Sequence, residues 1–256
     1  MSKSLDTDKL EREVKSMYRD VAESVDAAFH FETGRDLVDR LGYDPDDLEY
    51  VPDASIDSFA GVGYHFDLVE LEPGEAVLDL GSGSGMDTFV AGVHVTETGT
   101  VTGIDMTDEQ VEKARNLAAD AGFHNVEFHQ GYIETLPFED GSFDAAISNG
   151  VINLSAEKDR VFEEVSRVLK PDGRLALSDI ISEQRLSESI KTNAALWAAC
   201  IGGAEQIDDY TAMIETPGFE LIEVRDNSQY EFTSERAQSA CQKYGVKSIS
   251  LVARKR

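Results

Sequence analysis

The chain has 256 residues, a length that suits one large domain or one domain with an added cap. Hydrophobic residues make up 41% of it, which is enough for a core and excludes wholesale disorder. The formal net charge of −27 argues against nonspecific binding of nucleic acid and against an anionic membrane surface, because both need a basic face. We therefore expect neither a nucleic acid nor a membrane as partner.

Acidic residues recur along the whole chain rather than in one tail, for example at Asp46, Glu139 and Asp208. A distributed excess of this size keeps a protein in solution but makes it repel itself at low salt. We hypothesise a salt-rich cytoplasm, where screening shortens the reach of that repulsion. An ordinary acidic cytosolic enzyme is the alternative.

No stretch reaches the ~18 apolar residues of a membrane span, and the N-terminus lacks the apolar region of a signal peptide. A cytoplasmic protein is therefore expected. Cys200 and Cys241 are the only cysteines, which excludes a disulfide framework and a cysteine-rich zinc site. The five histidines show no HExxH spacing, so no bound metal is expected.

The N-terminal part is expected to be helical over residues 5–41, where Leu10 and Val14 fall at helical spacing and Gly34 interrupts. Residues 42–66 contain several prolines and glycines and are expected to be irregular.

From Pro73 onward, short apolar runs alternate with helical segments. The clearest helix is 108–121, which Thr107 or Asp108 would cap and Gly122 would end. Such alternation predicts an α/β fold with a parallel, doubly wound sheet. The expected strands are 76–80, 100–104, 126–129, 143–148 and 174–179, and the further helices are 88–95 and 158–169, the last stopped by Lys170-Pro171-Asp172-Gly173.

The C-terminal part is expected to be mainly helical from Ile180 to Ile214. A strand at 219–225, a helix at 234–244 and a last strand at 246–254 follow. Two closing strands without an obvious crossover fit an antiparallel end of the sheet.

The segment Val77–Gly85 reads Val-Leu-Asp-Leu-Gly-Ser-Gly-Ser-Gly and ends the first strand. Its glycines allow a tight turn and close approach of a ligand to the backbone, and the helix that follows offers free N–H groups. Asp105 ends the second strand, where a carboxylate can accept hydrogen bonds from ribose hydroxyls. The spacing differs from the G-x-G-x-x-G of dinucleotide enzymes, which favours S-adenosylmethionine (SAM) over NAD.

Five further segments accompany Val77–Gly85: Leu-Val-Asp-Arg-Leu-Gly-Tyr at 37–43, Gly-Ile-Asp-Met-Thr at 103–107, Ile-Glu-Thr-Leu-Pro at 133–137, Ile-Ser-Asn-Gly-Val-Ile-Asn-Leu-Ser at 147–155 and Val-Leu-Lys-Pro-Asp-Gly-Arg-Leu at 168–175. With them the chain resembles the class I SAM-dependent methyltransferases over about residues 70–181. It resembles the arsenite methyltransferases in particular from about 14 to 215. The resemblance implies a Rossmann-like fold, SAM as cofactor and methyl transfer to a small acceptor.

The resemblance also implies roles for individual residues. Asp79 would help place the amino group of SAM, and Asp105 would hold its ribose. Asn149 would face the reacting methyl group. The remaining cofactor positions are Gly81, Gly83 and Gly85 at the methionine end, Met106 and Ile133 beside adenine, and Glu134 as acceptor for its exocyclic amine.

The chain departs from the arsenite methyltransferases in its cysteines. That family is expected to hold As(III) with three thiolates, soft ligands for a thiophilic centre. This chain has Gly61-Val62-Gly63 and Gly150 at two of the expected positions and matches the third at Cys200. Cys200 is therefore a candidate catalytic residue or an inert core residue.

Several alternatives remain open at this point. The acceptor could be a trivalent arsenical, another soft nucleophile, or the substrate of a C- or O-methyltransferase of the quinone-modifying type. An O or N acceptor would need a base, for which His65 and Glu134 are the candidates. A SAM-binding protein without turnover and an NAD-dependent oxidoreductase are further alternatives.

We expect three parts: a helical cap and cofactor lid at 1–70, the SAM-binding core at 71–181, and the substrate roof with the closing strands at 182–256. The sequence makes no prediction about the oligomeric state.

Overall fold

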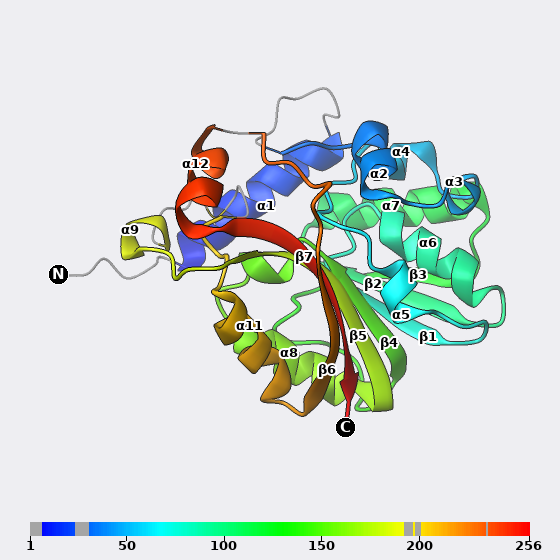
Figure 1. Cartoon of the computed structure of the whole chain (residues 1–256). Coiled ribbons are helices and arrows are strands. Elements are labelled where there is room, and N and C mark those ends of the chain that lie inside the picture. Colours follow the sequence, from blue (N-terminus) through cyan, green and yellow to red (C-terminus); the bar gives the residue numbers. More distant parts are fainter. Residues whose placement is uncertain (1–6, 24–30, 192–196, 198–200, 234) are drawn as a thin grey trace.

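A computed structural model describes residues 7–23, 31–191, 197, 201–233 and 235–256. Its centre is a seven-stranded sheet in the order β3-β2-β1-β4-β5-β7-β6 (Figure 1). The strands are β1 (Ala76–Leu80), β2 (Thr100–Asp105), β3 (Val126–Gln130), β4 (Phe143–Asn149), β5 (Leu169–Ser182), β6 (Phe219–Asp226) and β7 (Val246–Lys255).

Strands β1 to β5 pair in parallel, as the alternation of strands and helices predicts. Strand β7 runs antiparallel to both β5 and β6 and lies between them. The predicted antiparallel pairing at one end of the sheet is therefore confirmed, with the antiparallel strand second from the edge.

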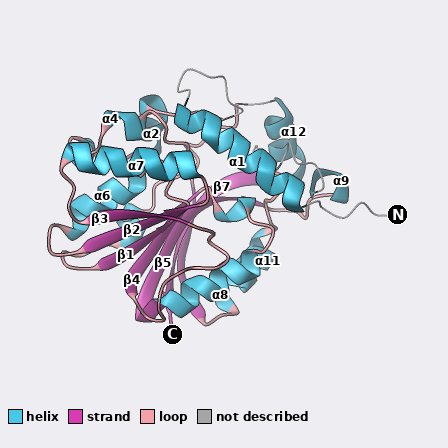
Figure 2. Ribbon diagram, turned by 180° about the vertical axis from the view of Figure 1, so that it is seen from behind, coloured by secondary structure: helices cyan, strands magenta, loops and turns pink. Residues whose placement is uncertain are grey.

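Helices cover both faces of this sheet (Figure 2). One face packs under α6 (Met86–Val95) and α7 (Asp108–Ala121), and the other under α8 (Lys158–Val168) and α11 (Ile207–Glu215). Strand β1 serves both cores, because Val77 faces the first and Leu78 and Leu80 face the second.

The N-terminal part contributes one long and several short helices. Helix α1 (Thr7–Glu23) lies beside α7 (Figure 1). The helical region predicted over 5–41, with its interruption at Gly34, is confirmed for α1 and for α2 (Arg35–Leu41), and its residues 5–6 and 24–30 lie outside the described residues. The remaining helices are α3 (Pro45–Leu48), α4 (Asp53–Ile56), α5 (Phe66–Val69), the 3-10 helix Ile152–Leu154, α9 (Glu188–Lys191) and α12 (Glu235–Tyr244).

Three expectations need correction. The stretch expected to be mainly helical from Ile180 begins as strand, because β5 continues to Ser182 and pairs there with β7. Residues 42–66 are not wholly irregular, because α3 and α4 form there, and Asp44 caps α3 by accepting a hydrogen bond from Asp46 N at 2.9 Å. Strand β5 begins at Leu169 rather than Arg174, because Leu169 already pairs with Phe143 before the register shifts.

Candidate functional site

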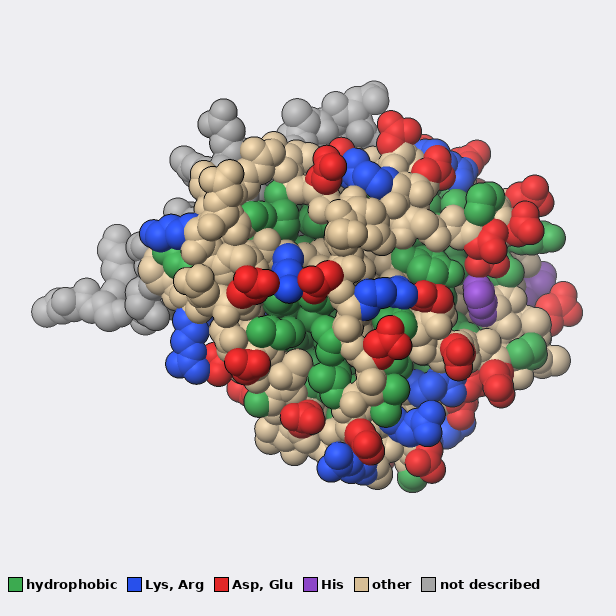
Figure 3. Space-filling model, in the orientation of Figure 1, with side chains coloured by type: hydrophobic (Ala, Val, Ile, Leu, Met, Phe, Trp, Pro, Cys, Tyr) green, Lys and Arg blue, Asp and Glu red, His purple; other side chains and the backbone are tan. Residues whose placement is uncertain are grey.

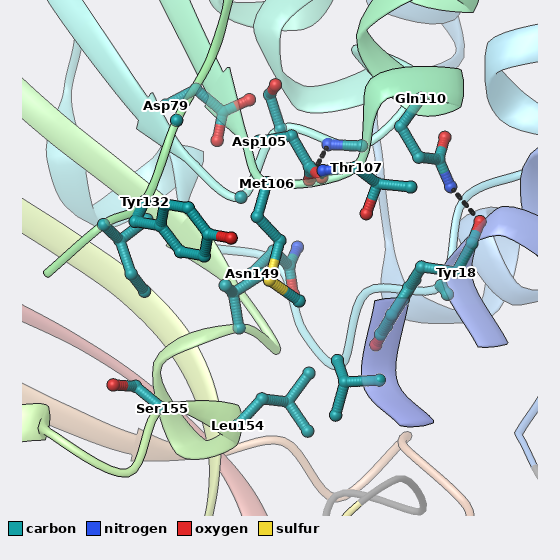
Figure 4. A pocket seen from close by; sticks show the side chains of 18 of the residues that line it. Tyr18, Asp79, Asp105, Met106, Thr107, Gln110, Tyr132, Asn149, Leu154 and Ser155 are labelled. Carbon is teal, nitrogen blue, oxygen red and sulfur yellow. Dashed lines mark hydrogen bonds between the residues drawn. The ribbon is translucent and has the colours of Figure 1, made fainter. Parts of the chain in front are cut away.

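A cavity of about 640 Å³ opens where the parallel strands end (Figure 4). Its walls come from the loops that follow β1, β2, β3 and β4, and from α1. Ligands of open α/β sheets bind outside the carboxyl ends of the strands, so this position agrees with the fold.

The turn after β1 is held in a shape that needs glycine. The amides of Gly81 and Ser82 both donate to the carbonyl of Ile104, at 2.8 and 3.0 Å. Gly81 has φ +70°, and a Cβ there would lie 2.4 Å from the side chain of Val151. Gly81 and Gly83 therefore offer bare backbone to the cavity that they line.

Gly85 lies behind this wall and is not among the residues that line the cavity. It caps α6 at φ +92°, and a Cβ there would lie 2.7 Å from the ring of Phe128. The turn into α6 and the packing against Phe128 explain why this residue is a glycine. The expectation had instead placed Gly85 at the methionine end of SAM.

Asp105 connects the glycine turn to the end of β2. One carboxylate oxygen accepts from Gly83 N at 3.0 Å and the other from Thr107 N at 2.8 Å. Burial raises the pKa of this carboxyl although both backbone bonds lower it. A carboxylate has about four acceptor sites, so Asp105 keeps capacity for two hydroxyl groups.

Met106, Ile133 and Glu134 all line the cavity. The first two offer apolar surface. A Glu134 oxygen accepts a hydrogen bond of 2.5 Å from the Ser155 hydroxyl, so this carboxylate is tied to the loop after β4 rather than free in solvent.

Two buried carboxylates, Asp79 and Asp87, share the inner wall of the cavity. Thr88 donates to Asp79 at 2.6 Å, and Tyr43 and Asn149 donate to Asp87 at 2.6 and 2.9 Å. Burial raises the pKa of Asp79 to about 8, with a further rise from Asp87, and burial raises that of Asp87 to about 6. Within the described residues, no cation is among the groups that shift these two pKa values.

Asn149 lines the cavity, but its polar atoms are engaged by the protein. Its oxygen accepts from Val62 N at 2.8 Å, and its amide nitrogen donates to Gly63 O at 3.0 Å and to Asp87. Through these hydrogen bonds Asn149 joins the end of β4 to the segment 61–63.

Helix α1 closes the cavity from the N-terminal side. Leu10, Val14 and Tyr18 of its buried face line the cavity. Gln110 of α7 donates to Tyr18 O at 2.9 Å and accepts from the Ser84 hydroxyl, so it connects α1 to the glycine turn (Figure 4).

Two of the places at which the resemblance implies cysteines, the segment 61–63 and Gly150, lie close together. Val62 is 1% exposed and packs with Ile180 and Ile201. A Cβ at Gly150 would lie 3.2 Å from Val62. Cys200 lies outside the described residues.

Of the two base candidates, only Glu134 lines the cavity. His65 is fully buried and its Nδ1 lies 3.1 Å from the Ser178 hydroxyl. Burial lowers the pKa of His65 to about 3, so the imidazole is neutral at ordinary pH.

The sequence reasoning missed Asp87, Tyr43 and Gln110. Asp87 carries one signal, since it is an acid in the first turn of an otherwise buried helix directly after the glycine turn. Gln110 gives no such signal, because only the tertiary fold brings it to the cavity. Tyr43 ends the segment 37–43, but its contact with Asp87 behind the cavity wall follows only from the tertiary fold.

The chain matches the family described as methyltransferase domain over residues 71–218. It is 42% identical over 199 residues to an arsenite methyltransferase from Halobacterium salinarum, covering 77% of this chain and 50% of that protein. It is 44% identical over 150 residues to another from Aquipseudomonas alcaligenes, covering 56% and 43%. The chain thus spans about half the length of the curated relatives it matches.

A solved structure is also similar. It is an arsenic(III) S-adenosylmethionine methyltransferase from Chlamydomonas reinhardtii, with a TM-score of 0.64 and 31% identity, covering 88% of this chain and 74% of that one. Together with the sheet order and the glycine turn, these similarities show that the chain belongs to the class I SAM-dependent methyltransferases.

Proposed function

We propose that this chain transfers a methyl group from SAM to a small-molecule acceptor. The observation that carries the proposal is the inner cavity wall, where the glycine turn and Asp105 stand beside the buried pair Asp79 and Asp87. Two buried carboxylates are costly without a balancing charge. SAM carries an ammonium and a sulfonium group beside one carboxylate, so it brings a net positive charge to this wall.

The site residues divide the binding task in this proposal. Gly81 and Gly83 admit the methionine part against bare backbone, Asp79 and Asp87 balance its positive charge, and Asp105 accepts from the ribose hydroxyls. Met106 and Ile133 flank adenine, with Glu134 at its amine. Bound SAM supplies an electrophilic methyl group. Positioning and exclusion of water by α1 provide the rest of the catalysis.

The acceptor is proposed to be bound without a cradle of several protein thiolates. The segment Gly61–Gly63 and Gly150 stand at the expected cysteine positions, and Val62 of that segment packs in an apolar cluster. Soft nucleophiles such as As, Se or S react through a lone pair and need no base. A trivalent arsenical that already carries thiols or methyl groups suits this site better than free arsenite.

A C- or O-methyltransferase acting on an apolar metabolite is the second candidate. It is favoured by the apolar side of the cavity, which Leu10, Val14, Phe59 and Leu154 form. His65 is buried and does not line the cavity, so Glu134 is the remaining base candidate for an O acceptor.

Arsenic speciation tests the acceptor. The protein is incubated in molar KCl with SAM, a thiol and trivalent arsenic, beside a Cys200→Ser variant, and SAM binding is measured separately by calorimetry. Methylated arsenic that disappears in the variant would support an arsenical acceptor and a functional Cys200. Binding of SAM without methylated arsenic would favour the apolar metabolite. Absence of SAM binding would contradict the proposal itself.

We also propose a salt-rich cytoplasm as the location of this protein and a division of the chain into three parts. The net charge of −27 and the similarity to a protein of Halobacterium salinarum support a salt-rich cytoplasm. No helix among the described residues is long and apolar enough to cross a membrane. The contacts of α1 support a cap within 1–70, with SAM bound by 71–181 and the acceptor roof within 182–256.

A further inference from the structure

Lys158 is a buried cation close to the cavity that the proposed function does not use. It is 5% exposed and stands at the first position of α8. A positive charge at a helix N-terminus is unfavourable, and lysines are almost never this buried without partners. Neither helix formation nor solvation favours a lysine at this position. Its burial must therefore be explained by its contacts.

The first contact is with the turn 154–157. The Lys158 ammonium group donates to the Ser155 carbonyl at 2.7 Å. All four residues of that turn line the cavity, and the Ser155 hydroxyl donates to Glu134 on the adenine side. Lys158 therefore fixes the backbone of one cavity wall.

The second contact is with Trp197. The ammonium nitrogen lies 4.8 Å from the centre of the indole ring, within the range of a cation–π interaction. Trp197 is 5% exposed and packs against Leu10 and Val14 of α1 and against Leu154. Trp197 therefore packs behind the apolar cavity wall that α1 and the turn 154–157 form.

We propose that Lys158 is a positioning residue for methyl transfer, holding the turn 154–157 and Trp197 against each other and so setting the shape of the cavity wall. The inference rests on the proposed function. It accounts for a buried cation that is not among the residues lining the cavity.

Other charged groups act on Lys158 from the neighbouring elements: Asp159 on α8, Asp179 on β5, Lys191 on α9 and Glu205 before α11. Burial lowers the pKa of Lys158 to about 8, against a rise from the acidic neighbours. The ammonium form therefore prevails below that pH and is lost above it.

The test uses Trp197, which is the only tryptophan of the chain and so a specific fluorescence probe. SAM affinity is measured by calorimetry, and tryptophan emission is followed from pH 6.5 to 9.5. In Lys158→Met we expect about tenfold weaker SAM binding, the scale of one hydrogen bond to a charged group, and no emission step near pH 8. Lys170→Met, at a partly exposed ion pair with Asp144 away from the cavity, is the matched control and should change neither readout.

Lys158→Arg is a second variant that tests the proposal if Lys158→Met fails to fold. It keeps the cation without titrating, so SAM affinity should stay within about threefold while the emission step disappears. A folded Lys158→Met protein with unchanged SAM affinity, or with the emission step intact, would overturn the role of Lys158 alone. An unaltered protein that shows the emission step but binds no SAM would overturn the proposed function, and the positioning role with it.

Discussion

At the scale of single residues, the site has two features. It contains glycines that no other residue can replace, and it contains buried acids that destabilise the protein. Asp79 and Asp87 are buried, and their raised pKa values mean that the SAM-free protein holds protons that the unfolded chain would release. This pair opposes stability at neutral pH and favours a cationic ligand.

The pH dependence follows from the sign of these shifts. A folded-state pKa above the unfolded value gives stability that is present at low pH and is lost as the pH rises through the folded value. We expect the SAM-free protein to lose stability between pH 4 and pH 8, the interval between the ordinary pKa of Asp79 and its raised value of about 8. SAM affinity should rise over the upper part of the same interval. Thermal melts and calorimetry across this range test both trends, and an affinity independent of pH would contradict the role of the pair.

Replacing Asp79 by Asn separates stability from binding. The neutral amide removes the cost of the buried charge, so the SAM-free protein should gain roughly 1–3 kcal/mol at pH 8. SAM binding should weaken by about tenfold or more, because one counter-charge is lost. Denaturant unfolding and calorimetry give the two quantities. A variant that loses stability and keeps its affinity would show that Asp79 serves packing instead.

Two glycines with positive φ form a matched pair for a second prediction. Ala at Gly81 would meet Val151 at 2.4 Å at the cavity wall, whereas Ala at Gly42 meets nothing within 4 Å. Gly81→Ala should therefore abolish detectable SAM binding, and Gly42→Ala should cost about 1 kcal/mol of stability through backbone strain alone. Comparable SAM affinity in the two variants would contradict the close approach of ligand and backbone at Gly81.

At the scale of elements, the long periodic segments could be predicted from the sequence. Helix 108–121 appears with the predicted bounds, with Thr107 at its N-cap and Gly122 in the left-handed conformation at its end. Local signals determine such an element, since capping and apolar spacing lie within the segment itself.

Elements decided by distant contacts could not be predicted in this way. The four-residue helices α3 and α4 are too short to show a period. Strand β5 passes through Lys170-Pro171-Asp172-Gly173 because β4 pairs with Leu169. In the same way, the sequence indicated the glycine turn and Asp105 and led to the hypothesis of a helical lid at 1–70. It did not indicate which residues of α1 line the cavity, because tertiary packing brings them there.

The attachment of α1 gives a prediction at this scale. Gln110→Ala removes the link between Tyr18 O and the Ser84 hydroxyl without touching the core of the sheet. SAM should dissociate several-fold faster, the equivalent of about 1 kcal/mol for one hydrogen bond. Stopped-flow measurements test this, with Gln238→Ala on α12 as control. Equal dissociation rates would mean that apolar contacts alone hold α1 over the cavity.

At the scale of the whole molecule, the dominant feature is the excess of acid. Even if each of the 23 Lys and Arg paired with one acid, 27 of the 50 Asp and Glu would have no basic partner. Figure 3 shows acidic side chains spread over the visible face rather than gathered in one patch. Their repulsion therefore acts on the molecule as a whole.

Added salt should therefore stabilise the fold. We expect the melting temperature to rise by about 5 °C or more between low salt and molar KCl, a gain of roughly 1–3 kcal/mol for a chain of this size. A series of melts in KCl tests this, with sucrose as a control for effects that do not involve screening. A flat or falling melting temperature would contradict the salt-rich setting.

The position of β7 has a consequence for the order in which the protein is made. Strand β6 has β7 as its one neighbour in the sheet, whereas β5 pairs with β4 along one edge and with β7 along the other. A ribosome that has synthesised residues up to Gly245 has therefore exposed one open edge on β5 and left β6 unpaired. Completion of the sheet must wait for the residues after Gly245, so this chain is exposed to edge-to-edge association until synthesis has passed β7.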